Sequence, residues 1–389
     1  MKHALSVFLL SFLCSVSVLC CGRDVVVGAA RQEAWLPLLQ GRRVALFSNH
    51  TGIVDGRHTL DLLLERGITV TAVFSPEHGF RGTAGAGDHV DNSVDEKTGV
   101  PILSLYNGNS ARPSDEAMQL FDVLVCDIQD VGLRFYTYYI SMVRLMDACA
   151  DFGKLFVVFD RPNPNGWYVD GPVLDMQYKS GVGWLPIPVV HGMTLGELAL
   201  MVNGEGWLTD GRQCPLQVVP CKHYTHRTRY RLPVPPSPNL QNMLAVYLYP
   251  SICYFEATPV SLGRGTDKPF LCYGHPNMQG CSFSFTPRSM QSAPKPPQQD
   301  RLCYGVDLST MTEEEAMQHG LDLTWLIDAF RNLHMDNWFF SPFFEKLIGV
   351  GYVRKMILEG RSADEIRACW HDDVARFRQQ RKPYLLYKE

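Results

Sequence analysis

Five short apolar runs, each ending in polar residues, constrain the fold of this chain more than any other feature. The runs cover residues 44–48, 69–74, 101–105, 122–128 and 155–160. Continuous apolar character over so few residues is typical of strands buried on both faces of a parallel sheet. Helical patterns lie between the runs, over residues 58–66 and 136–150. The sequence therefore predicts right-handed βαβ units and a Rossmann-like, doubly wound α/β sheet.

The length of the chain favours a second packed unit. With 389 residues it exceeds what one typical hydrophobic core supports. The proline-rich run at residues 233–239 marks the junction, because consecutive prolines continue neither a helix nor a central strand. We expect a Rossmann-like domain over residues 24–236 and a smaller α/β domain over residues 237–389. In the second domain a loop-rich section reaches about residue 306, and helices follow, the last over residues 363–381.

The N-terminus has the pattern of an export signal over residues 1–20. Lys2 precedes an apolar run and then small residues. Two alternatives stay open: an uncleaved anchor, and a lipid on a cysteine of the segment Leu19-Cys20-Cys21-Gly22. No later stretch is long and apolar enough to span a bilayer. We expect an exported protein in the periplasm or on the outer face of a cell membrane, attached there by an N-terminal lipid in the second case.

Composition and motifs exclude several functions. A net charge of −4 gives no basic face for nucleic acid. The segment after the first strand has neither G-x-G-x-x-G nor a P-loop, so no nucleotide cofactor is expected. The nine cysteines beyond the signal contain no CxxC pair, which argues against a zinc ribbon. A Cys214–Cys221 or a Cys272–Cys281 bridge stays open.

Histidines do not suggest a metal site either. His50, His78, His89 and His191 lack the i, i+4 helical spacing of a zincin. We expect no metal and no cofactor.

Polar side chains follow the predicted strands, where a parallel sheet gathers its ligand-binding residues. Glu77 is the most informative of them, because it stands between Pro76 and a glycine turn, an unusual place for a solvated acid. Acids, amides and an arginine at one edge are typical of a carbohydrate site. The residues concerned are Asn49, Glu77, Tyr106, Asn107, Asp127, Asp130, Arg161, Asn163 and Asn165.

Alternatives stay open for several of these residues. Asp127 and Asp130 would otherwise cap the following helix or pair with Arg134. Tyr136 and Tyr138, at the helix entrance, point either into the crevice or into the helix core.

A second polar cluster lies in the run from Cys253 to Phe270. Arg264 stands between two glycines that let the backbone approach a ligand, and its guanidinium suits a substrate carboxylate. The alternative is an internal ion pair between Glu256 and Arg264.

Several long motifs contain these residues. They are Ser75-Pro76-Glu77-His78-Gly79-Phe80-Arg81-Gly82, Asp127-Ile128-Gln129-Asp130-Val131-Gly132, Arg134-Phe135-Tyr136-Thr137-Tyr138, Asp160-Arg161-Pro162-Asn163-Pro164, Pro236-Ser237-Pro238-Asn239 and Gly263-Arg264-Gly265-Thr266-Asp267-Lys268-Pro269-Phe270. Together these motifs resemble the exo-β-N-acetylmuramidase family, formerly a domain of unknown function. The resemblance runs from about residue 30 to the end. One departure is Phe255-Glu256-Ala257-Thr258-Pro259, where the family usually has Glu-Gly-Thr-Asn.

The resemblance implies a peptidoglycan-recycling glycosidase whose site lies in the cleft between the two domains. The expected reaction releases N-acetylmuramic acid from the non-reducing ends of peptidoglycan-derived muropeptides or disaccharides. Glu77 matches the family's proposed catalytic acid. Asp130, Tyr136 or the substrate's own acetamido group is the second participant, and retaining, inverting and substrate-assisted routes all stay open. A non-catalytic sugar-binding protein of the envelope is the alternative function, and the oligomeric state stays open.

The expected substrate contacts come from both domains. They are Asn49, His78, Asp127, Arg161, Asn163, His191, Asn239, Glu256, Arg264 and Thr266.

Overall fold

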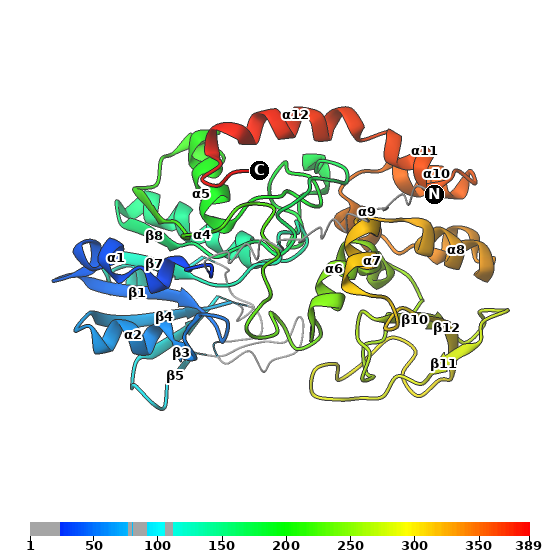
Figure 1. The fold of residues 1–389 in the computed structure, drawn as a ribbon, viewed down its shortest axis with the longest axis horizontal. Helices are drawn as coiled ribbons and strands as arrows, with labels where there is room; N and C mark the ends of the chain where they lie inside the picture. Colours follow the sequence, from blue (N-terminus) through cyan, green and yellow to red (C-terminus); the bar gives the residue numbers. More distant parts are fainter. Residues whose placement is uncertain (1–23, 77–79, 81–91, 106–111) are drawn as a thin grey trace, which may run out of the picture.

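A seven-stranded sheet forms the centre of the first domain. The computed structural model describes residues 24–76, 80, 92–105 and 112–389. Within them the strand order is β5-β6-β4-β1-β7-β8-β9, and only β5 runs antiparallel to its neighbour (Figure 1). The strands are β1 (Arg43–Ser48), β4 (Thr69–Ser75), β5 (Ser93–Val94), β6 (Pro101–Ser104), β7 (Val123–Asp127), β8 (Leu155–Phe159) and β9 (Leu216–Val219). All five strands predicted from the apolar runs are present.

The strand order fixes where a ligand site belongs. Without β5, the order along the sheet is third, second, first, fourth, fifth and sixth in the chain, which is the Rossmann order. The order reverses between β1 and β7, and ligands of such sheets bind outside the carboxyl ends of the strands at that point. Residues just after Ser48 and Asp127 therefore border the expected crevice.

Both faces of the sheet are covered. Alternate side chains of β1 and β7 enter two different cores, with Phe47 and Cys126 in one and Leu46 and Val125 in the other. Helices α4 (Tyr138–Phe152) and α5 (Leu195–Gly204) cover the first face, and α1 (Gln32–Leu39) and α2 (Thr59–Glu65) cover the second. The predicted doubly wound α/β fold is confirmed.

Local sequence signals set the helix ends. Thr194 and Glu197 form a capping box at the start of α5. Helix α4 ends at Gly153, which has a φ of 59° that glycine adopts without strain. This helix begins at Tyr138, two residues later than the pattern suggests, so Tyr136 lies in the turn before it.

The second domain contains a small sheet, in keeping with the expected α/β class. Strands β10 (Cys272–His275), β12 (Cys303–Asp307) and β11 (Phe283–Phe285) pair antiparallel in that order. The positions of these strands were not predicted, because the strands are very short and Gly274 faces Gly305 across the sheet, which removes the apolar alternation. They lie within the section expected to be loop-rich.

Helices make up the rest of this domain. They are α6 (Met243–Ile252), α7 (Glu313–His319), α8 (Thr324–Leu333), α9 (Phe343–Ile348), α10 (Tyr352–Leu358), α11 (Ala363–Ala368) and α12 (His371–Arg381). The single helix predicted over residues 363–381 is two helices.

Short elements complete the described fold. They are α3 (Asp115–Met118), the ribbon of β2 (Ile53–Val54) and β3 (Arg57–His58), and turns of 3₁₀ helix at Gly28–Ala30, Met176–Tyr178, Thr209–Gly211, Cys253–Ala257, Asp336–Phe339 and Lys382–Tyr384.

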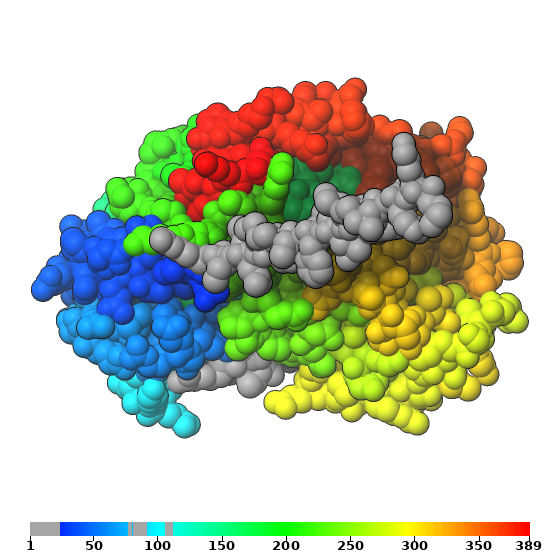
Figure 2. Space-filling view, in the orientation of Figure 1, coloured from blue at the N-terminus to red at the C-terminus, as the bar shows by residue number. Residues whose placement is uncertain are grey.

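Two features join the domains. Helix α12 runs from the second domain back across the first, and the C-terminus lies near α5 (Figures 1 and 2). There the Tyr387 hydroxyl donates to Asp160 at 2.6 Å. Arg134 is fully buried and donates to two carbonyls of the first domain and to those of Leu347 and Ile348 in α9. Because its donors go to carbonyls, Arg134 is not the partner of Asp127 or Asp130.

The nine described cysteines are all free thiols, so neither of the bridges left open above is formed. None of the helices in the described ranges combines the length and the apolar character that crossing a bilayer requires.

Candidate active site

Asn49 is held rigidly at the carboxyl end of β1. Its side-chain amide donates to the Tyr138 hydroxyl at 2.9 Å, and its carbonyl oxygen accepts from the backbone and hydroxyl of Thr51 at 2.9 and 2.6 Å. The residue is fully buried. Asn49 therefore positions Tyr138 at the entrance of α4.

Asp127 and Arg161 form a buried, two-pronged ion pair. The Arg161 Nε lies 2.6 Å from Asp127 Oδ1, and its Nη2 lies 2.9 Å from Oδ2. Thr59 also donates to this carboxylate, and the carbonyl of Ile53 accepts from the guanidinium. Burial alone would lower the pKa of Arg161, but the Asp127 carboxylate raises it. The pair joins the ends of β7 and β8, and a substrate contact from Arg161 would require breaking it.

Asp130 is different, because half of its carboxyl group has no partner. Oδ1 accepts from the backbone of Gly132 at 2.7 Å, whereas Oδ2 is buried without a hydrogen-bond partner among the described residues. Burial raises the pKa of Asp130 to about 7, even though the backbone hydrogen bonds from Gly132 and Val131 oppose the shift. Such a carboxyl group exchanges a proton near neutral pH, which suits an acid or a base.

Asn163 and His191 lie behind this turn. The Asn163 amide donates to Met193 O at 2.9 Å and accepts from Asn165 N at 2.7 Å. His191 accepts from Met193 N at 3.3 Å, and burial lowers its pKa to about 3, so the ring is neutral. Gly132 packs so closely on Asn163 that an added Cβ would lie 2.2 Å from the amide. Both side chains shape the loops around the site.

A pocket between the domains gathers several of the predicted residues. This inner pocket, of about 100 Å³, is lined among others by Tyr136, Tyr138, Ser237, Asn239, Glu256 and Arg264. Tyr136 donates from its hydroxyl to Pro236 O at 2.8 Å, which ties the turn before α4 to the proline-rich junction. The first domain thus supplies aromatic walls and the second supplies charge.

Glu256 and Arg264 form the ion pair that the sequence left as an alternative. Glu256 Oε1 lies 2.5 Å from Arg264 Nη2 and 3.1 Å from Nε. The guanidinium carbon also lies 5.0 Å from the centre of the Phe270 ring. Burial alone would lower the pKa of Arg264, and Glu256 raises it. Glu256 uses one carboxylate oxygen on Arg264.

Asn239 and Thr266 complete the predicted set in the second domain. Asn239 is 3% exposed; its amide donates to Ser292 O at 3.0 Å, and its carbonyl oxygen has no partner within the described ranges. Thr266 donates to Gly263 O at 2.6 Å and accepts from Lys268 N at 3.0 Å. Asn239 thus lines the inner pocket with an acceptor oxygen that no described residue uses. Thr266 instead stabilises the loop that carries Arg264.

Glu77 and His78 lie outside the described residues, as do Tyr106 and Asn107. Their roles stay predictions.

Two larger depressions adjoin the inner pocket. The basic pocket, of about 530 Å³, shares Glu256 and Arg264 with it and adds Lys295 and three prolines. The outer pocket, of about 440 Å³, shares Ser237 with it and is lined also by His50, Pro235, Pro238, Gln241, Met290, Gln291 and Ser292. Each of the two depressions therefore lies next to the inner pocket, with side chains that line both.

The segment that separates these two depressions, residues 290–297, was not predicted to belong to the site. It lies in the section read as loop and carries no motif. The hydrogen bond from Asn239 to Ser292, 53 residues further along the chain, shows that this segment lies beside the inner pocket.

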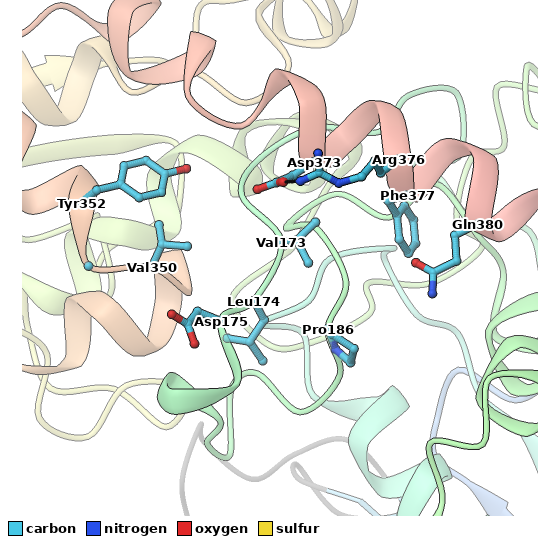
Figure 3. Close-up of a pocket in the computed structure, with 11 residues that line it drawn as sticks. Val173, Leu174, Asp175, Pro186, Val350, Tyr352, Asp373, Arg376, Phe377 and Gln380 are labelled. Carbon is cyan, nitrogen blue, oxygen red and sulfur yellow. Dashed lines mark hydrogen bonds and ion pairs between the residues drawn. The ribbon is translucent and has the colours of Figure 1, made fainter. Parts of the chain in front are cut away.

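A further depression, of about 450 Å³, lies apart from the predicted residues. Figure 3 shows Asp373, Arg376, Phe377 and Gln380 of α12 along one side of it. Its lining contains none of the residues predicted to act, so we do not assign it to the reaction. No group of three or more His, Cys, Asp or Glu side chains in the described part of the chain is arranged to hold a metal.

Two family models together match most of the chain. Residues 44–244 match the family model described as exo-beta-N-acetylmuramidase NamZ, N-terminal, and residues 247–387 match its C-terminal counterpart. The peptidoglycan beta-N-acetylmuramidase NamZ of Bacillus subtilis (strain 168) is 38% identical over 377 residues, which cover 90% of this chain and 88% of that protein.

Two solved structures of DUF1343 family proteins from Bacteroides fragilis NCTC 9343 are also similar. One has a TM-score of 0.89 at 62% identity and the other a TM-score of 0.78 at 28% identity. Each alignment covers 94% of this chain and 99% of the other.

Proposed function

The chain belongs to the exo-β-N-acetylmuramidase family and is an exo-acting glycoside hydrolase of peptidoglycan, and we propose that it works in the inner pocket between its two domains. The observation that carries this assignment is that both halves of the chain match the family. The pocket lies where those halves meet, with Tyr136 from one and Arg264 from the other. The alternative of a non-catalytic envelope protein is not supported.

In this proposal Glu77 donates a proton to the leaving glycosidic oxygen. A glycosidase needs such a donor and a second group that supports the oxocarbenium-like transition state. Asp130 is one candidate for the second group, because its open oxygen and its pKa of about 7 suit proton transfer at neutral pH. Tyr136 is another, as a group that orients water or the substrate's acetamido group.

Arg264 binds the lactyl carboxylate of N-acetylmuramic acid. Its guanidinium already faces one carboxylate, that of Glu256, and the pair lines both the inner and the basic pocket. A ligand carboxylate would share the guanidinium with Glu256, because both hydrogen bonds from Arg264 go to a single oxygen of Glu256. Asn239 offers an acceptor to a sugar hydroxyl or amide.

Hydrolysis of a chromogenic β-N-acetylmuramide by the purified protein tests the proposal. We expect release of the chromophore near neutral pH and much slower release from the matching β-N-acetylglucosaminide. Sugar binding without release at any pH would instead support the envelope sugar-binding protein.

The stereochemistry of the first-formed product identifies the second group. Inversion would exclude both an enzyme nucleophile and the acetamido route, and it would leave Asp130 as a base. Retention would leave the acetamido group or a carboxylate as nucleophile.

The proposal extends to location. Lys2 and the apolar run after it support export to the periplasm or the outer face of a cell membrane, and Cys20 and Cys21 offer acceptors for a lipid. Cell fractionation of the full chain, with labelled fatty acid, tests both points. Recovery of the uncleaved chain in the cytosol would contradict export, and an unlabelled exported protein would contradict the lipid.

A further inference from the structure

The outer pocket adjoins the inner pocket and is built by both domains. Ser237 lines both pockets. His50, just after β1, stands on one side of the outer pocket, and the segment from Met290 to Ser292 of the second domain stands on the other. A ligand in the inner pocket that continued past Ser237 would therefore enter the outer pocket.

Two depressions adjoin the inner pocket, and two substituents of the substrate's sugar ring are too large for the inner pocket to hold as well. One group is the lactyl ether with its carboxylate, and the other is the glycosidic bond to the next sugar. The basic pocket lies beyond the Arg264–Glu256 pair and contains Lys295, so a carboxylate is favoured on that side. With the carboxylate on that side, the glycosidic bond would point toward Ser237 and the outer pocket.

The lining of the outer pocket suits an uncharged amino sugar. Pro235, Pro238 and Met290 provide an apolar surface for a sugar face, and Met290 is 38% exposed. Gln241 and Gln291 provide amides, which can donate to and accept from hydroxyl and acetamido groups. The Gln241 amide donates to Pro238 O at 3.2 Å, which leaves its carbonyl oxygen as an acceptor. Among the lining residues that the structure describes there is no Asp, Glu, Lys or Arg.

The wall formed by the second domain is held in place before any ligand binds. Met290 and Ala293 exchange backbone hydrogen bonds at 3.2 and 2.9 Å, which closes a hairpin. Arg288 N donates to Gly265 O at 2.7 Å and so fixes its base to the Arg264 loop. Ser292 O accepts from Asn239 at 3.0 Å and so fixes its tip to the proline-rich junction. Because this wall is already ordered, less conformational entropy is lost when a ligand binds.

We infer that the outer pocket is the binding site for the leaving saccharide, an N-acetylglucosamine residue joined to the muramic acid that is released. This inference rests on the proposed function of the inner pocket. It assigns to Gln241, Met290 and Gln291 a part in choosing the leaving group.

A comparison of two substrates, with and without the second sugar, tests this inference. For Gln241→Ala and Gln291→Ala we measure kcat/KM on the disaccharide N-acetylmuramyl-N-acetylglucosamine and on an aryl β-N-acetylmuramide, which lacks the second sugar. Loss of one neutral hydrogen bond changes binding by about 2- to 10-fold. The ratio of disaccharide to aryl activity is expected to fall by that factor in each variant. Gln299→Ala, an exposed glutamine of the same loop outside all three pockets, is the matched control and keeps the ratio.

Binding of free N-acetylglucosamine gives a readout that needs no hydrolysis. Saturation-transfer NMR is expected to detect the sugar on the unaltered protein and to show weaker contact in Gln291→Ala. An unchanged ratio in both variants, or no detectable sugar binding, would overturn the inference. If the unaltered protein binds N-acetylglucosamine but cleaves neither substrate, the proposed function fails and the binding site stands.

Discussion

Asp130 gives the sharpest test of the site, because its carboxyl group is buried and one of its oxygens has no hydrogen-bond partner among the described residues. Burial raises its pKa from the ordinary value of 3.8 to about 7. The folded chain therefore holds this proton more tightly than the unfolded chain between about pH 4 and pH 7. The free energy of unfolding must then fall as the pH rises through that window, at up to about 1.4 kcal/mol per pH unit.

The change Asp130→Asn removes the ionisation while keeping the shape. A shift of about three pKa units corresponds to roughly 4 kcal/mol between the two ends of the window. We expect the variant to gain stability relative to the unaltered protein as the pH rises, and urea unfolding from about pH 4 to pH 8 measures the difference. Asp160, whose pKa burial raises to about 6, titrates in both proteins, so its contribution cancels.

A flat difference between the two stability curves would refute the reasoning for Asp130. Activity supplies a second readout, since a catalytic Asp130 should produce a limb near pH 7 in the profile of kcat/KM. If Asp130→Asn stays active and keeps that limb, another group is responsible for it.

The remaining predictions concern the other charged residues. Glu77→Gln should lower kcat by about 10²- to 10⁴-fold in a folded protein, as loss of a general acid does, and a near-normal kcat would contradict its role. Arg161→Met should lower the free energy of unfolding by about 3–5 kcal/mol in urea, because it leaves the Asp127 carboxylate buried and unpaired, and a loss below about 1 kcal/mol would argue against the buried pair. Arg264→Ala should slow muramide hydrolysis far more than residual glucosaminide hydrolysis, by an amount worth about 1.5–3 kcal/mol, whereas an equal loss on both would make it only the partner of Glu256.

The sheet could be predicted from sequence because its signal is local. Each buried parallel strand is a continuous apolar run, and the capping box of Thr194 and Glu197 spans four neighbouring residues. The small sheet of the second domain gives no such signal, since Gly274 and Gly305 occupy the positions where packing side chains would reveal it. Strand β9 escaped prediction as well, being a short strand at the end of the large sheet.

The candidate site was harder to predict, because a residue type does not say which of its hydrogen bonds the scaffold uses. Asn163 and Asn239 follow the same kind of proline-containing motif and are equally buried. Both ends of the Asn163 side-chain amide are hydrogen-bonded to backbone, the amide nitrogen to Met193 O and the carbonyl oxygen to Asn165 N. The Asn239 amide donates to Ser292 O, and its carbonyl oxygen has no hydrogen-bond partner among the described residues. Only the fold distinguishes them.

The hydrogen-bond partners of each side chain also distinguish the two acids at the carboxyl ends of the strands. Asp127 is a full carboxylate partner of Arg161 and Thr59, so its charge is neutralised and both of its oxygens are occupied. Asp130, three residues later, accepts only from backbone N–H groups among the described residues, and no cation is among the groups that shift its pKa. Burial without a partner makes ionisation costly, and costly ionisation is what brings a carboxyl group into the pH range where it can give and take protons. Of these two acids, Asp130 is therefore the better candidate for proton transfer, and Asp127 is part of the buried ion pair that joins the ends of β7 and β8.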